Sequence, residues 1–239
     1  MRIGLIVNPI AGLGGAAGLK GTDGAGMPQL ARERGAEPVA EARAELALRA
    51  AAQASGDALE IVTVPGAMGG EAARAAGLSP TLFRLDPHDP TTSADTVAAA
   101  RALVDAGADL ILFAGGDGTA RDVVSVTGER VPVLGIPTGV KMHSAVFATS
   151  PAAAGRLVAR MVAGDARVAF APAEVMDVDE EGLRAGRLSA ALHGYARVPV
   201  ERRLMQRRRQ RRTRWRRPWR HPRRRSPRCR GQRTSSSSP

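Results

Sequence analysis

The sequence predicts an α/β fold with a parallel β-sheet, because short apolar runs alternate with alanine-rich helical segments along the first 170 residues. The apolar runs are five or six residues long and rich in Val, Ile and Leu, which is typical of strands buried on both faces. Hydrophobic residues make up 44% of the 239 residues and aromatic residues only 3%, so we expect a core of Ala, Val, Leu and Ile.

Five segments fit strands of this sheet. RIGLIV is an uninterrupted apolar run that ends at Asn8-Pro9, and LEIVTV alternates apolar and polar residues. DLILF is followed directly by a glycine-rich segment. The expected strands are 2–7, 59–64, 81–85, 109–113 and 131–136.

Helices are expected between these strands. EARAELALRAAAQ has high helix propensity, and Ser150-Pro151 is a typical helix start with proline at the first helical position. We expect Ser93 to cap the N-terminus of another helix and Gly107 to follow its C-terminus. The expected helices are 41–53, 71–76, 94–105, a helix that starts near residue 119 and runs through 121–126, and 151–163.

The chain divides by composition into three parts. Residues 1–168 are expected to form the α/β domain that binds nucleotide and phosphate. Strands at 175–178 and 188–197, joined by a turn at 179–182, predict the start of a β-rich second domain over 169–205. Residues 206–239 contain 15 arginines and no Ala, Val, Ile or Leu, so this tail is expected to be disordered.

The positive charge of the chain lies in its last residues. Residues 201–239 hold 17 arginines and one acid, whereas the preceding 200 residues carry a net charge of −4. One interpretation is a nucleic-acid arm in which Trp215 and Trp219 stack on bases. The other, which we favour, is a frameshift product, because an out-of-frame reading of GC-rich DNA gives such a composition. We therefore expect nucleic acid to bind only non-specifically, through this tail.

Other features point to a cytoplasmic protein. Cys229 is the only cysteine, so no internal disulfide can form, which fits a reducing compartment. The N-terminal apolar run is too short for a signal peptide, and no segment reaches the ~20 apolar residues of a membrane span. We expect no membrane association.

The segment FAGGDGTARD, residues 113–122, is the main candidate site. Glycines let main-chain N–H groups approach phosphate oxygens, and the following helix N-terminus adds partial positive charge. We expect Asp117 to project beside amides that are open to solvent and to take a proton from a hydroxyl or contact magnesium. The alternative is a tight turn in which the aspartate has no chemical role. The candidate phosphate-binding residues are Gly115, Gly116, Gly118 and Thr119.

Two further loops follow predicted strands. NPIAGLGG offers Asn8 and Gly12 as nucleotide contacts, although it matches a dinucleotide-binding fingerprint only loosely. GIPTGVKMHSAVFATS offers Thr138, Gly139 and Lys141, one of only two lysines in the chain. A solvated surface lysine and a core His143 are the alternatives in this loop. The four histidines lack ligand spacing, so no protein-bound metal site is predicted.

Together these segments resemble the NAD kinase superfamily, which also includes diacylglycerol and sphingosine kinases. NPIAGLGG, FAGGDGTARD, GIPTGVKMHSAVFA and MDVDEEGLRAGRLSAALHGYARVP are most similar to the predicted ATP-NAD kinase branch. The resemblance covers about residues 1–205. It implies that two domains hold the nucleotide between them, and that ATP or polyphosphate, with Mg²⁺, phosphorylates the 2′-hydroxyl of NAD.

The resemblance also assigns roles. Asp117 would activate the hydroxyl, the glycines of 115–118 and Thr119 would line the phosphates, and the Thr138-Gly139 loop would help to hold the dinucleotide. NAD and ATP are the implied ligands, and a homo-oligomer is possible. Typical members carry an Asn-Glu pair after GGDGT, which is absent here, and the second domain gives way to the arginine-rich tail. We therefore expect a truncated form of weak activity.

Two alternatives remain open. The first is a related kinase that acts on the hydroxyl of a lipid or another small molecule. The second is a non-catalytic accessory protein that binds nucleotide through the same loops.

Overall fold

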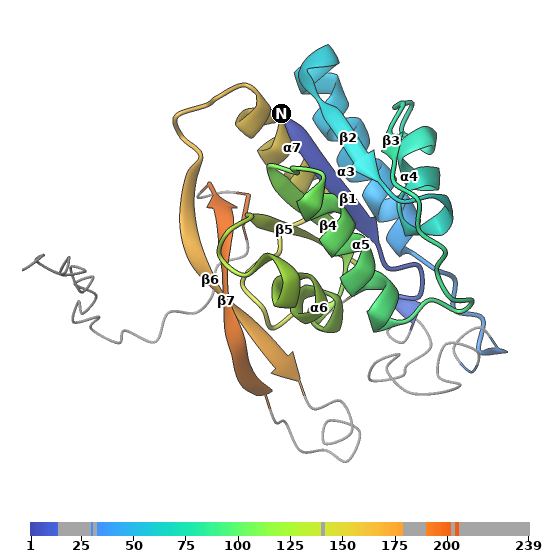
Figure 1. Cartoon of the computed structure of the whole chain (residues 1–239). Coiled ribbons are helices and arrows are strands. Elements are labelled where there is room, and N and C mark those ends of the chain that lie inside the picture. The colour runs from blue at the N-terminus through green and yellow to red at the C-terminus, as the bar shows by residue number, and fades with distance from the viewer. Residues whose placement is uncertain (14–29, 31–32, 140–141, 179–189, 202–203, 206–239) are drawn as a thin grey trace, which may run out of the picture. The chain divides into compact units, whose positions relative to one another are not determined.

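The computed structural model describes residues 1–13, 30, 33–139, 142–178, 190–201 and 204–205 (Figure 1). Its main element is a sheet of five parallel strands in the order β3-β2-β1-β4-β5, which confirms the predicted α/β fold. The strands are β1 (Arg2–Val7), β2 (Glu60–Thr63), β3 (Thr81–Leu82), β4 (Leu110–Gly115) and β5 (Val133–Pro137).

Helices cover both faces of the sheet (Figure 1). One face is covered by α3 (Ala40–Ser55) and α7 (Pro151–Val162), and the other by α5 (Ser93–Asp105) and α6 (Asp117–Thr127). Further helical elements are α4 (Gly70–Ala75) and the 3₁₀ turns η1 (Gly56–Ala58) and η2 (Gly66–Met68). Among the described helices, none is both long and apolar enough to cross a membrane.

The core is built mainly from aliphatic side chains, as the composition predicts. Phe113 and Phe147 are its largest buried side chains, and their rings meet edge to face with centroids 5.6 Å apart. Small residues allow α3 and α7 to approach closely: a Cβ at Gly155 would run into the carbonyl oxygen of Ala47 and lie 2.8 Å from the Cβ of Ala50. Alanine and glycine therefore set the spacing of these two helices.

Helix starts differ in part from the prediction. Ser150 caps α7 as expected, since its Oγ accepts the N–H of Ala153 at 3.1 Å. The cap of α5 is Thr92, one residue before the predicted Ser93, and its N–H donates to the carboxylate of Asp95 at 2.7 Å. An aspartate at the third helical position supplies this capping bond, which decides the start of the helix.

A second, two-stranded sheet follows α7. Its antiparallel strands are β6 (Ala169–Val178) and β7 (Ala190–Val200), both longer than predicted. The inward face carries Ala173, Val175 and Val198, which are buried, and β6 packs on α6. The predicted turn at 179–182 and the tail at 206–239 lie outside the described residues. Met1–Arg208 group as one compact unit, and the division at 168 stays a prediction.

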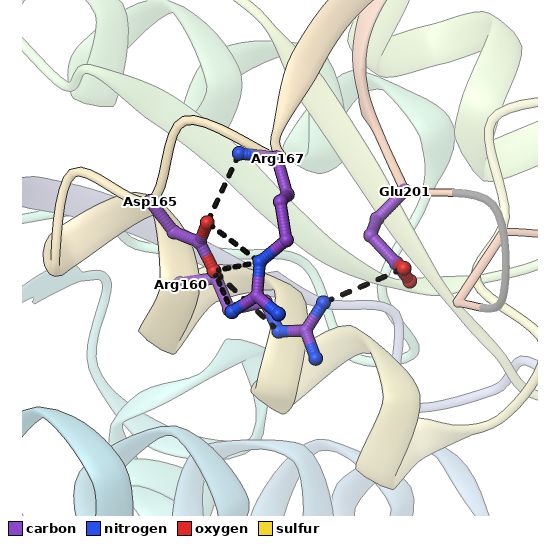
Figure 2. A network of polar contacts seen from close by, with 4 residues as sticks. All are labelled: Arg160, Asp165, Arg167 and Glu201. Carbon is purple, nitrogen blue, oxygen red and sulfur yellow. Dashed lines mark hydrogen bonds and ion pairs between the residues drawn. The ribbon is translucent and has the colours of Figure 1, made fainter.

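A network of charged side chains joins α7 to the end of β7 (Figure 2). Arg167 donates to both carboxylate oxygens of Asp165, the shortest contact being 2.7 Å, and these bonds lower the pKa of Asp165 to about 2. Arg160, on α7, lies 4.0 Å from Asp165 and 3.5 Å from Glu201. The network thereby links the loop before β6 and the residue after β7 to the same helix.

Candidate active site

The candidate site lies where the strand order of the main sheet reverses. From β1 the chain proceeds to β2 on one side, whereas β4 pairs with β1 on the other side. In open α/β sheets, ligands bind outside the carboxyl ends of the strands at such a point. The segments that begin at Asn8 and Gly116 leave the sheet there.

Asn8 connects the two segments across this point. Its main-chain N–H donates to the carbonyl oxygen of Ala114 at 3.0 Å, and its Nδ2 donates to Oγ1 of Thr119 at 3.0 Å. Its Oδ1 accepts the N–H of Ile10 at 3.2 Å, which shapes the turn after β1. The side chain of Asn8 is thus used within the protein, and it fixes the position of the two loops.

The glycines of the GGDGT segment have different roles. A Cβ at Gly115 would clash with the side chain of Thr119, so only glycine fits beneath this buried threonine. At Gly116, by contrast, a Cβ would meet no atom of the described residues within 4 Å. Gly116 is the N-cap residue of α6, so this open space lies beside the start of the helix.

Asp117 begins α6 and does not project freely, which corrects the expected orientation. The residue is half-buried, and its carboxylate accepts two main-chain bonds, from His143 at 2.9 Å and from Ser144 at 2.8 Å. The two amides reach different oxygens, Oδ2 and Oδ1 respectively. An ionised carboxylate has about four acceptor positions, so each oxygen retains one for a further hydrogen bond.

The segment that holds Asp117 is itself attached to β6. Ser144 is buried, and its Oγ accepts the N–H of Met176 at 3.0 Å. The N–H of Ala145 donates to the carbonyl oxygen of Glu174 at 2.8 Å. The carboxylate of Asp117 is therefore connected to the second sheet through one short stretch of main chain.

The loop after β5 contributes the third group of predicted residues. Thr138 is 2% exposed, and its Oγ1 has no hydrogen-bond partner among the described residues. A Cβ at Gly12 would lie 2.6 Å from the carbonyl oxygen of Thr138, so the loops after β1 and β5 are in close contact. Arg43, on α3, donates to the carbonyl oxygen of Pro137 at 2.8 Å, and this bond fixes the start of the loop against α3.

Nine of the ten predicted site residues lie on these three loops or in the adjoining ends of β4 and α6. Lys141 falls outside the described residues. Sequence reasoning missed Ser144 and Arg43, whose contacts with the site depend on the folded chain and have no local motif. The nine residues are Asn8, Gly12, Gly115, Gly116, Asp117, Gly118, Thr119, Thr138 and Gly139.

A known protein family matches the part of the chain that contains these loops. Residues 3–166 match the sequence model of the ATP-NAD kinase N-terminal domain. The chain belongs to the ATP-NAD kinase family. The match runs from β1 to just after α7 and so includes all three loops of the candidate site. No curated protein and no solved structure matches the chain.

Membership of the ATP-NAD kinase family indicates a kinase-type phosphotransferase that binds nucleotide. Within the described residues, no group of three or more His, Cys, Asp or Glu side chains is arranged to hold a metal ion. Asp117 is the carboxylate of the GGDGT segment, and it keeps two acceptor positions beside the two main-chain bonds that it accepts.

Proposed function

We propose that this ATP-NAD kinase family member transfers a phosphoryl group from ATP or polyphosphate to the 2′-hydroxyl of NAD, giving NADP. The observation that carries the proposal is the carboxylate of Asp117 in the first turn of α6, held by two amides with an acceptor position left on each oxygen. Such a carboxylate can orient a hydroxyl and accept its proton.

The start of α6 supplies groups that can bind phosphate. The first N–H groups of a helix have no acceptor within the helix, and the helix dipole favours negative charge there. The accessible space beside Gly116 and the eleven-residue length of α6 support phosphate binding at this end. Asn8 and Thr119 hold the neighbouring loop in place by their hydrogen bond.

The magnesium ion that accompanies ATP is compatible with these residues. In phosphoryl-transfer sites Mg²⁺ is held by one or two carboxylates together with phosphate oxygens and water. Asp117 provides one such carboxylate. When bound, the ion neutralises charge on the transferred phosphate.

The proposed reaction follows from these positions. The 2′-hydroxyl of the ribose donates a hydrogen bond to Asp117, and its oxygen attacks the terminal phosphorus of ATP. The bond from that phosphorus to the bridging oxygen breaks, ADP leaves, and the hydroxyl proton passes to the carboxylate. Little covalent help is needed from the protein, because this chemistry depends on positioning and on charge stabilisation.

The test compares Asp117→Asn with Asp109→Asn. Asp109 also accepts a main-chain bond, from Arg2 at 2.8 Å, but it precedes β4 and lies at the opposite edge of the sheet. NADP formation from NAD, ATP and magnesium should fall by about 10²–10⁴-fold in Asp117→Asn, with nucleotide binding retained. Turnover should be unchanged in Asp109→Asn.

Three other results would contradict parts of the proposal. Equal losses of turnover in both variants would attribute the effect to stability and contradict a chemical role for Asp117. Phosphorylation of a lipid or sugar hydroxyl in place of NAD would refute the proposed acceptor. Nucleotide binding without turnover of any acceptor would favour the accessory protein.

A further inference from the structure

Ser144 connects the candidate active site to β6 through both its main chain and its side chain. Its N–H donates to Oδ1 of Asp117 at 2.8 Å, and its Oγ accepts the N–H of Met176 at 3.0 Å. The residue is 2% exposed, so water does not compete readily for either bond. The N–H of Met176 would lose its partner if the hydroxyl were removed.

The two residues at the ends of this connection lie in regular elements, whereas the residues between them do not. Asp117 has its main chain fixed in the first turn of α6, and Met176 belongs to β6. His143 and Ser144 lie between elements, outside any helix or strand. Their amides therefore need an additional anchor if they are to hold a carboxylate in one rotamer. The bonds to Met176 and to Glu174 provide it.

We infer that Ser144 is a positioning residue for Asp117. Its hydroxyl fixes the 143–144 main chain against β6, and the two amides of that segment then hold both carboxylate oxygens in the orientation that the reaction requires. The inference rests on the proposed function for its effect on turnover, but the link between Ser144 and Asp117 can be measured without any reaction.

The first test measures amide hydrogen exchange in the full chain. Ser144→Ala should speed exchange of the main-chain N–H groups of residues 143 and 144 by about tenfold or more, because their anchor to β6 is lost. The matched control is Ser125→Ala, on the exposed side of α6, where Oγ donates only to the carbonyl oxygen of Asp122. Exchange at 143 and 144 should be unchanged in this control.

The second test is kinetic. In Ser144→Ala, kcat for NADP formation should fall by about 10- to 100-fold while KM changes little, since a displaced carboxylate affects the reaction more than binding. Ser144→Cys keeps the size of the side chain with a weaker acceptor, and it should recover part of kcat. The Asp117→Asn/Ser144→Ala double variant should be no slower than Asp117→Asn alone.

The outcomes separate the two ideas. Unchanged exchange at 143 and 144 in folded Ser144→Ala would overturn the positioning role, whatever the turnover. Faster exchange in Ser144→Ala, together with a wild-type protein that forms no NADP, would support the link to Asp117 and contradict the proposed function. If Ser144→Ala does not fold, unchanged exchange and kcat in Ser144→Cys would overturn the inference.

Discussion

Replacing Thr138 by valine tests the buried hydroxyl that lies directly after β5. Thr138 is 2% exposed, and its Oγ1 has no hydrogen-bond partner among the described residues. An unpaired buried hydroxyl costs about 1–3 kcal/mol in mutational data, and valine has nearly the same shape. Thr138→Val should therefore raise the free energy of unfolding by about 1 kcal/mol without ligand.

Thr63→Val is the matched control. Thr63 is also fully buried at the carboxyl end of its strand, but its Oγ1 donates to the carbonyl oxygen of Leu5 at 2.8 Å. The same substitution removes a satisfied bond there and should lower the free energy of unfolding by about 1 kcal/mol or more. The two valine variants should thus shift the denaturant midpoint in opposite directions, with unchanged m-values.

The stabilisation of each protein by bound nucleotide tests whether Thr138 contacts the ligand. At a free ligand concentration of 100 times Kd, a nucleotide raises the free energy of unfolding by about 2.7 kcal/mol. If the hydroxyl of Thr138 binds the nucleotide, this gain should be about 1 kcal/mol smaller in Thr138→Val. A Thr138→Val protein that is destabilised as much as Thr63→Val without ligand would refute the reasoning, because the hydroxyl would then already have a partner.

Three further predictions address the core, the pair formed by Asp95 and His88, and the site. Gly155→Ala should lower the free energy of unfolding by about 1–3 kcal/mol in chemical denaturation, despite alanine's higher helix propensity, because the new Cβ meets the carbonyl oxygen of Ala47. Burial alone would raise the pKa of Asp95, but hydrogen bonds from His88 and its neighbours hold that pKa well below its ordinary value, and the bond to Asp95 raises the pKa of His88. Asp95→Asn should therefore lower the free energy of unfolding most between about pH 4 and 6.5. The difference from the wild type should shrink in acid, as Asp95 becomes protonated, and at higher pH, as His88 loses its proton. Denaturant unfolding at a series of pH values measures this difference. Asn8→Asp should weaken nucleotide binding about tenfold in calorimetry, since it adds a negative charge beside the amides that we propose to bind phosphate.

Much of the fold could be predicted from the sequence, because strand and helix positions follow from local patterns. β1 occupies the predicted residues, and α7 starts at the predicted proline. The GGDGT segment misled the prediction of α6, since its glycines indicate a loop whereas the helix already begins at Asp117. β3 is shorter than predicted because it is an edge strand that pairs only at Thr81 and Leu82.

The composition of the site was partly predictable, and its internal contacts were not. Parallel strands bring their carboxyl ends to one edge, so loops after β1, β4 and β5 could be grouped in advance. The bonds from His143 and Ser144 to Asp117 join residues 26 and 27 positions apart through main-chain amides. Any residue other than proline has such an amide, so no side-chain pattern signals the contact.

The attachment of Ser144 to β6 has a practical consequence for dividing this chain. The family match ends at residue 166, three residues before β6 begins. A fragment that ends at that boundary would keep every loop of the site but lose Met176 and Glu174. These two residues form the hydrogen bonds that attach the segment of residues 143–145, which holds Asp117, to β6. The boundary of the family match therefore does not coincide with the boundary of the hydrogen-bonded unit around Asp117. A protein expressed only to residue 166 would keep the amides of residues 143 and 144 but lose their anchor on β6.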